Sequence, residues 1–417
     1  MSRSRKRKEN PICAAISTWL GSLPSSIIDS IATHDIKQLI DRAPKRWVVY
    51  EPMVLLPSGS FTTAPWPALL ASLDPAQKDS LWTAILSELS PATKPALTHL
   101  AINEGIPLHL SDSSSPFSSK PGEAEGERGG GEEENLFRSP TGLHLLHGSF
   151  GAPFPTATTK PTPSDFQSAL WVSTKQNGIY QTWAPRHTMF SRGNIKEKAR
   201  LLSFHPSRTR AGDDRYAVDL YAGIGYFAFP FAALGLRVLC WEVNPWSAEG
   251  LRRGAAANGW SVRVVEGLPG GGAEGADADV AGILRGGEQI VVFLENNRHA
   301  RERIAAARRA HGLEVLHVNC GFLPSSKGVW RDAWEIAVGP EGGRERWLHL
   351  HENIGAEEVE ERKGEVQRLF GEWVGQGGVD RKTEARVEHV ELVKTFAPGV
   401  WHCVFDVMIT SFSGDVE

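Results

Sequence analysis

The sequence is poor in the residues that build disulfide frameworks and metal knuckles. Its 417 residues include only four cysteines, widely spaced at Cys13, Cys240, Cys320 and Cys403. This spacing excludes a dense disulfide framework and a cysteine-based metal knuckle, and it favours a reducing compartment. No apolar run approaches the roughly 20 residues of a membrane span, and the N-terminus lacks the apolar core of a signal peptide. We therefore expect a soluble, cytoplasmic protein.

An overall excess of positive charge is also missing. The chain has 45 Lys+Arg against 49 Asp+Glu, a net charge of −4, so bulk charge does not draw it to nucleic acid. The charges are segregated, however. Residues 111–135 carry seven acidic and two basic side chains, whereas residues 181–210 carry seven basic and one acidic. Any nucleic-acid surface must be local, and the second segment is the candidate.

Changes in composition along the chain predict five segments. They are a basic tail (1–10), an N-terminal α+β domain (11–110), a flexible linker (111–135), a subdomain with a basic loop (136–210) and an α/β domain (211–417). In the last segment strand-like and helix-like runs alternate, which predicts a parallel, doubly wound sheet. Two further strand-like runs, 387–396 and 400–410, predict an antiparallel hairpin at its edge. Asn177-Gly178 predicts another hairpin.

The sharpest local signal is a glycine turn between a buried strand and an apolar helix. Gly223-Ile-Gly225 allows a tight turn and close approach of a ligand to the backbone. The next strand ends on Glu242, 19 residues after Gly223, a spacing suited to hydrogen bonds with ribose hydroxyls. The third glycine of a dinucleotide fingerprint is absent. Together with Asp219 in the first strand, this favours S-adenosylmethionine (SAM); the alternative is a packing turn with Glu242 as a surface acid.

Several segments resemble one family of tRNA-modifying enzymes. Residues 219–227 and 241–245 look like the SAM site shared by the tRNA guanosine N1-methyltransferases and the wybutosine-synthesising aminocarboxypropyltransferases. Further segments resemble the second group: residues 189–200, 317–326, 348–353 and 393–402. The arrangement from Trp47 through Trp183 resembles its fungal members in particular. The resemblance implies a Rossmann-type SAM-binding domain behind a smaller RNA-facing domain. It also implies transfer of the 3-amino-3-carboxypropyl group of SAM to 4-demethylwyosine beside the anticodon of phenylalanine tRNA.

Site residues are carried over from the family motifs. Ser191 and Lys198 stand at cofactor positions, in addition to Glu242. A further pair of contacts falls on Asn296 and Asn297, where Asn replaces the usual Asp or the register slips by one. The turn after the fourth strand lacks the Asn-Pro-Pro-like pattern of base methyltransferases. We expect Leu323, Pro324 and Ser325 to lie next to the acceptor, with no dedicated general base.

The basic loop is the candidate RNA surface. The residues predicted to bind tRNA phosphates are Arg186, Arg192, Lys196 and Arg200, in a patch that also contains Lys198, Arg208 and Arg210. Trp171, Trp183 and His187 either stack on a splayed base or belong to the core. Two rival functions remain open, a SAM-dependent tRNA guanosine N1-methyltransferase and a non-catalytic tRNA-binding protein. His349 and His351 have metal-ligand spacing without a third ligand nearby, so no metal is expected.

Overall fold

The computed structural model consists of two compact units. One comprises residues 1–174 and 184–189, and the other comprises residues 175–183 and 190–417. The structure describes residues 9–28, 33–90, 95–103, 109–110, 133–134, 142–153, 160–204, 215–268, 276–338, 345–376 and 381–413. The expected basic tail and acidic linker therefore lie almost wholly outside the described residues, as do Arg208 and Arg210. The expected domain boundaries stay a prediction.

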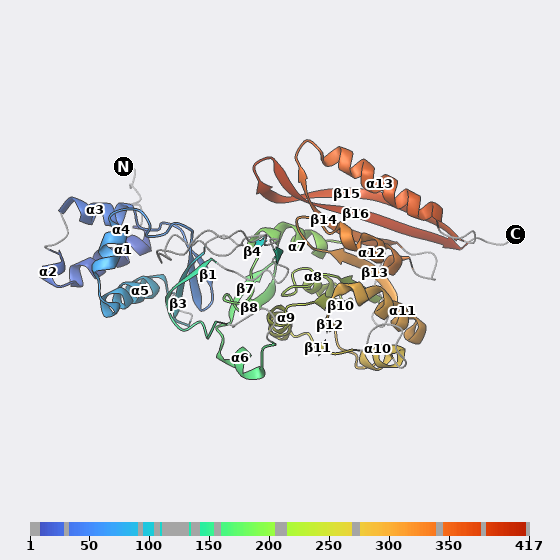
Figure 1. Ribbon diagram of the computed structural model, residues 1–417, viewed down its shortest axis with the longest axis horizontal. Helices are drawn as coiled ribbons and strands as arrows, with labels where there is room; N and C mark the ends of the chain where they lie inside the picture. Colours follow the sequence, from blue (N-terminus) through green and yellow to red (C-terminus); the bar gives the residue numbers. More distant parts are fainter. Residues whose placement is uncertain are drawn as a thin grey trace, which may run out of the picture. The chain divides into compact units, whose positions relative to one another are not determined.

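The first unit packs helices onto a small mixed sheet (Figure 1). The sheet order is β1-β2-β3-β6, with β1 (Val48–Tyr50), β2 (Met53–Leu56), β3 (His99–Asn103) and β6 (Leu143–His147). Its helices are α1 (Pro11–Ser22), α2 (Ser25–Ile28), α3 (Thr33–Asp41), α4 (Trp66–Ser72), α5 (Pro75–Leu89) and α6 (Pro163–Ser168). Asn10 and Asp74 cap α1 and α5, each followed by a proline at the first helical position. Trp66 and Ile85 are fully buried in the core.

Two short strand pairs lie outside this sheet. β4 (His109–Leu110) pairs with β5 (Glu133–Glu134), and β7 (Val172–Gln176) pairs with β8 (Ile179–Trp183). The turn between β7 and β8 has positive φ at both Asn177 (51°) and Gly178 (82°), as a type I′ turn requires. The hairpin expected from Asn177-Gly178 is confirmed.

The second unit is built on an eight-stranded sheet of order β11-β12-β10-β9-β13-β14-β16-β15. The strands are β9 (Arg215–Asp219), β10 (Arg237–Glu242), β11 (Val262–Val265), β12 (Ile290–Leu294), β13 (Glu314–Cys320), β14 (Arg346–Gly355), β15 (Arg381–Ala397) and β16 (Val400–Ser413). The first six positions in this order run parallel, and β16 and β15 add antiparallel at one edge. The parallel sheet and the edge hairpin are both confirmed, although the hairpin strands are longer than expected.

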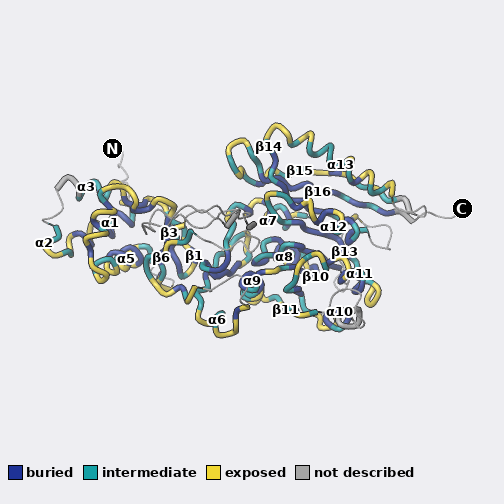
Figure 2. The backbone as a smooth tube through the Cα atoms, in the orientation of Figure 1, coloured by how far each residue is buried: buried dark blue, intermediate teal, exposed yellow. Residues whose placement is uncertain are grey.

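Helices cover both faces of this sheet. They are α7 (Ile195–Leu202), α8 (Ala228–Ala233), α9 (Pro245–Ala257), α10 (Ala276–Leu284), α11 (Ala300–His311), α12 (Trp330–Ala337) and α13 (Val359–Gln376), with short 3₁₀ turns η1 (Arg192–Asn194), η2 (Asn297–His299) and η3 (Lys327–Val329). Adjacent residues of β9 show the two faces: Val218 packs in a cluster with Ile304, whereas Ala217 packs in a cluster with Phe231. Figure 2 shows the resulting buried strands. Within the described residues, no helix is both long and apolar enough to cross a bilayer.

Candidate cofactor site

The glycine turn after β9 and the acid at the end of β10 meet directly. Gly223 N–H donates to Oε2 of Glu242 and Asn244 N–H donates to Oε1, both at 2.7 Å. Gly223 and Gly225 have φ of 54° and 88°, and a Cβ at Gly225 would lie 2.5 Å from the Phe229 ring. Burial raises the pKa of Glu242 to about 7. Glu242 is thus held against the turn by backbone donors, unlike a free surface acid.

Asp219 is more deeply buried than Glu242. Its side chain is fully buried, and Oδ1 accepts from Asn319 Nδ2 (3.0 Å) on the neighbouring strand β13 and from Tyr221 N–H (3.3 Å). Burial raises the pKa of its carboxyl to about 6. Hydrogen bonds continue from Asn319 Oδ1 to His351 Nε2 (3.1 Å) and from His351 Nδ1 to His402 Nε2 (2.9 Å). Asp219 therefore braces the turn from inside the sheet.

Lys198 is a buried ammonium held by neutral groups. Its Nζ donates to Oε1 of Gln176 (2.5 Å) and of Gln181 (2.6 Å), and it lies 5.4 Å from the centre of the Phe190 ring. Within the described residues no carboxylate pairs with it, and burial lowers its pKa to about 7. A buried cation without a counter-ion is costly for the fold. The arrangement suits an anionic ligand.

Tyr226 links the Ser191–Lys198 segment to the glycine turn. Its hydroxyl accepts from Ser191 N–H at 2.9 Å, and its ring centre lies 5.8 Å from Lys198 Nζ. The same ring lies over Gly223, where a Cβ would approach it to 3.1 Å. Ser191, Lys198, Gly223 and Glu242 are thereby brought together around one aromatic side chain. Sequence reasoning did not assign Tyr226 a role; its position directly after the Gly-Ile-Gly turn was the available signal.

Residues 295–297, which follow β12, are held in place by hydrogen bonds within the protein. Glu295 accepts from Trp241 Nε1 (3.2 Å) and pairs with Arg303 (3.2 Å). Asn296 caps η2 by accepting from the N–H of Arg298 (3.0 Å), and Asn297 donates to Leu220 O (2.9 Å) at the end of β9. Asn297 thus reaches the glycine turn region, while Asn296 is exposed. Their roles as cofactor ligands stay predictions.

The turn expected to face the acceptor lies next to the end of β9. Phe322 stacks on Tyr221 with ring centres 4.9 Å apart. The carbonyl of Pro324 accepts from the N–H of Asn353 (2.7 Å), and Ser325 Oγ donates to Glu352 (2.8 Å). These bonds fix the turn containing Leu323, Pro324 and Ser325 to β14, and its place beside the acceptor stays a prediction.

Arg200, whose role as a phosphate ligand stays a prediction, lies in an internal network of ion pairs. Its guanidinium bonds both oxygens of Glu197 (2.8 and 2.7 Å) and both oxygens of Asp406, one of them at 3.1 Å. Both carboxylates are buried, with side-chain exposures of 0% and 1%. Asp406 continues the network to His349 Nδ1 (2.7 Å). Arg200 therefore closes an internal ion-pair network, which the positive charge of the segment did not indicate.

The other basic residues differ in their surroundings. Arg192 is exposed in η1, and Lys196 is exposed while pairing with Glu391 (2.6 Å) and donating to Leu392 O (3.1 Å). Arg186, in the first unit, donates to Gly151 O (3.0 Å). Arg192 and Lys196 remain the accessible candidates for phosphate contacts.

The aromatic and histidine candidates belong mainly to the interior. Trp183 is buried and stacks on Phe190 with ring centres 4.3 Å apart, and His187 is buried with its pKa lowered to about 4 by desolvation. Trp171 donates from Nε1 to Phe166 O (2.8 Å). His349 and His351 are both buried in hydrogen bonds to other side chains. Among the described residues, no group of three or more His, Cys, Asp or Glu side chains is placed to hold a metal ion.

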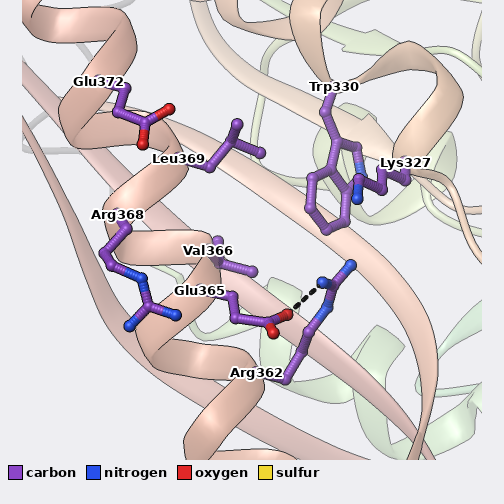
Figure 3. Close-up of a pocket in the computed structure, with 8 residues that line it drawn as sticks. All are labelled: Lys327, Trp330, Arg362, Glu365, Val366, Arg368, Leu369 and Glu372. Carbon is purple, nitrogen blue, oxygen red and sulfur yellow. Dashed lines mark hydrogen bonds and ion pairs between the residues drawn. The ribbon is translucent and has the colours of Figure 1, made fainter.

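A separate hollow of about 330 Å³ lies between η3 and α13 (Figure 3). Its lining residues are Lys327, Trp330, Arg362, Glu365, Val366, Arg368, Leu369 and Glu372. Arg362 is bound by Glu352 (2.8 Å) and by Glu365 (2.6 Å), so its charge is already compensated. The hollow shares no lining residue with the cofactor site, and we assign it no ligand.

Comparison with known proteins places this site in a family. No protein-family model matches the chain. The tRNA wybutosine-synthesizing protein 2 of Schizosaccharomyces pombe is 36% identical over 365 residues, which cover 87% of this chain and 72% of that protein. The chain belongs to the tRNA wybutosine-synthesizing protein 2 family.

Further members of the tRNA wybutosine-synthesizing protein 2 family extend the match. The Saccharomyces cerevisiae protein is 29% identical over 407 residues, covering 89% of this chain and 75% of its own. The crystal structure of P. horikoshii TYW2 in complex with MeSAdo aligns with a TM-score of 0.52 at 16% identity, over 96% of this chain and 99% of that chain. That likeness confirms the Rossmann-type fold expected from the strand and helix alternation.

Proposed function

We propose that the protein is a SAM-dependent tRNA 3-amino-3-carboxypropyltransferase of wybutosine synthesis. The donor substrate is SAM, and the acceptor is a ring carbon of 4-demethylwyosine beside the anticodon of phenylalanine tRNA. Methylthioadenosine is the second product. Family membership supports the class of reaction. The observation that carries the donor is the buried Lys198 ammonium, which has no carboxylate partner among the described residues and lies beside the Gly223–Glu242 turn.

Each residue of the site has a physical role in holding the donor. Both Glu242 oxygens accept from backbone N–H groups, and the carboxylate keeps lone-pair capacity for a ribose hydroxyl. Gly223 and Gly225 let the turn close against the rings of Tyr226 and Phe229, and the nucleoside lies along the backbone of this turn. Lys198 and the Ser191 hydroxyl donate to the donor's carboxylate, a charge-assisted contact that turns the amino-acid chain toward the acceptor.

In the proposed transfer the bonds formed and broken account for all atoms and electrons, so the reaction needs no metal ion and no redox partner. SAM supplies a sulfonium whose methyl and methylene carbons are all electrophilic, so the carbon that faces the acceptor decides the product. A carbon–carbon bond forms between the acceptor ring and the γ-methylene of the chain, and the carbon–sulfur bond breaks with its electron pair on sulfur. The ring carbon then loses its proton to solvent water, which restores the aromatic ring. The protein supplies orientation and an apolar surface at Leu323 and Pro324.

Accessible cations supply the proposed tRNA contacts. Arg192 and Lys196 bind phosphates near the anticodon in this proposal, and Arg186 contributes from the first unit. Changing Arg192 and Lys196 together to Ala should weaken tRNA binding and reduce the salt slope by about one per lost phosphate contact. Arg331→Ala, an exposed arginine on α12, is the control. An unchanged slope removes this pair from the RNA surface. The proposed compartment is the cytoplasm.

Product analysis tests the reaction. The protein is incubated with SAM and precursor tRNA, and the nucleoside released from SAM is identified by liquid chromatography. Methylthioadenosine is expected. S-adenosylhomocysteine would show methyl transfer and overturn the proposal.

Calorimetry tests the donor site itself. The unmodified protein should bind SAM, and Glu242→Gln should weaken binding about 10- to 100-fold because one charged hydrogen-bond acceptor is lost. Absence of SAM binding, or an unchanged affinity in the variant, would favour a non-catalytic tRNA-binding protein.

A further inference from the structure

Lys394 lies on β15 at an irregularity in the strand pairing. Leu392 pairs with Cys403 and Lys394 pairs with His402, so Val393 is an extra residue on this strand. Val393 is buried. A bulge of this kind redirects the following side chain and is common beside active sites.

The redirected side chain reaches the Ser191 segment. Lys394 Nζ donates to Ser191 Oγ at 3.0 Å. Its stem packs on Gly193 so closely that a Cβ there would lie 2.4 Å from Cδ and 2.9 Å from Nζ. Lys196 adds a second link between the same segments by donating to Leu392 O. The edge hairpin therefore closes directly onto the segment that holds Ser191.

Lys394 resembles Lys198 in lacking an acidic partner. Within the described residues no carboxylate pairs with Lys394, and burial lowers its pKa. The residue opposite it, His402, has a pKa lowered to about 3 by burial and is therefore neutral. Two ammonium groups thus flank Ser191 and Tyr226, one bonded to Ser191 and the other beside the Tyr226 ring.

We propose that Lys394 is a second cationic ligand for the carboxylate of the donor's aminocarboxypropyl chain. This inference rests on the proposed function, because the proposed function places the donor's carboxylate at the Ser191 hydroxyl. Lys198 and Lys394 hold the carboxylate from two directions, and a two-point grip fixes the direction of the chain more firmly than one ammonium does. The edge hairpin thereby becomes part of the donor site.

Three ligands separate this role from general effects on the pocket. Calorimetry compares Lys394→Met with the unmodified protein for SAM, for decarboxylated SAM and for methylthioadenosine. Affinity for SAM should fall about 10- to 100-fold, as for loss of a charged hydrogen bond, while the other two ligands change less than about twofold. Equal losses for all three ligands, or no loss for SAM, would overturn the proposal. Lys175→Met, an exposed lysine on β7, is the matched control.

A second variant separates direct contact from orientation of Ser191. In a Ser191→Ala background, Lys394→Met should still weaken SAM binding at least about fivefold, because the ammonium acts on the carboxylate itself. No further loss would reduce Lys394 to a support for the serine hydroxyl and overturn its role as a ligand. If the unmodified protein fails to bind SAM, the proposed function fails first. If it binds SAM and Lys394→Met binds equally well, only the role of Lys394 fails.

Discussion

Lys198 should make the stability of the second unit depend on pH in a direction opposite to that of a salt-bridged lysine. Its pKa is lowered from 10.5 to about 7 by burial. Between these values the unfolded chain holds a proton that the folded chain has lost, so stability rises with pH. The slope is about 1.4 kcal/mol per pH unit, and the gain from pH 7 to 10.5 is about 4 kcal/mol.

The assay compares the unmodified protein with Lys198→Met at each pH. Urea unfolding is followed by pulsed hydrogen exchange in peptides from β9 and β10, so that the signal belongs to the second unit. Other titrating groups are common to both proteins and cancel. The difference in unfolding free energy should change by about 1 kcal/mol per unit between pH 7.5 and 9.5, with the variant favoured at the lower pH.

Saturating SAM provides an internal check on this reasoning. A bound carboxylate restores the charged form of Lys198, so its pKa rises and the pH dependence should flatten over the same range. A flat difference without SAM would refute the claim that the lysine is desolvated. A difference that persists unchanged with SAM would refute its contact with the donor.

Two further variants test separate parts of the site. Arg200→Met removes the guanidinium from buried Glu197 and Asp406, leaving Asp406 only its bond to His349, and should lower the unfolding free energy by about 3–5 kcal/mol. Lys196→Met, at a side chain 61% exposed, should cost about 1 kcal/mol or less. Similar costs of the two variants in urea unfolding would contradict the buried network. Gly225→Ala forces a Cβ into the Phe229 ring at positive φ, and it should lower the unfolding free energy by about 1–3 kcal/mol and weaken SAM binding. The control is Gly328→Ala, whose Cβ would lie in open space and should leave SAM affinity unchanged. Normal SAM binding by Gly225→Ala would show that the turn tolerates a side chain.

The spacing of residues along the sequence predicted those parts of the site whose residues lie close together in the chain. The glycine turn and Glu242 were found because a strand, a tight turn and the next strand tip follow each other within a few tens of residues. The alternation of strands and helices likewise predicted the parallel sheet. Residues 205–214, at the end of the basic loop, lie outside the described residues, so that part of the expectation stays a prediction.

Long-range contacts account for what the sequence did not reveal. Arg200 forms an ion pair with Asp406, which lies 206 residues away in the sequence. A run of positive charge in the sequence does not predict such a partner. Lys394 meets Ser191 across 203 residues, and the bulge that redirects it depends on the register of two strands. Tyr226 was visible in its motif, but its role depends on where its ring lies. Charge and spacing identify candidates, whereas tertiary pairing decides which side chains remain available to a ligand.

The bond between Lys394 and Ser191 has a consequence for the order of synthesis. The segment with Ser191 and Lys198, the glycine turn and Glu242 all leave the ribosome well before β15. The partner of Ser191 is therefore added 203 residues after the serine itself. The proposed grip on the donor's carboxylate from two sides is therefore complete only after the edge strand has been synthesised and paired.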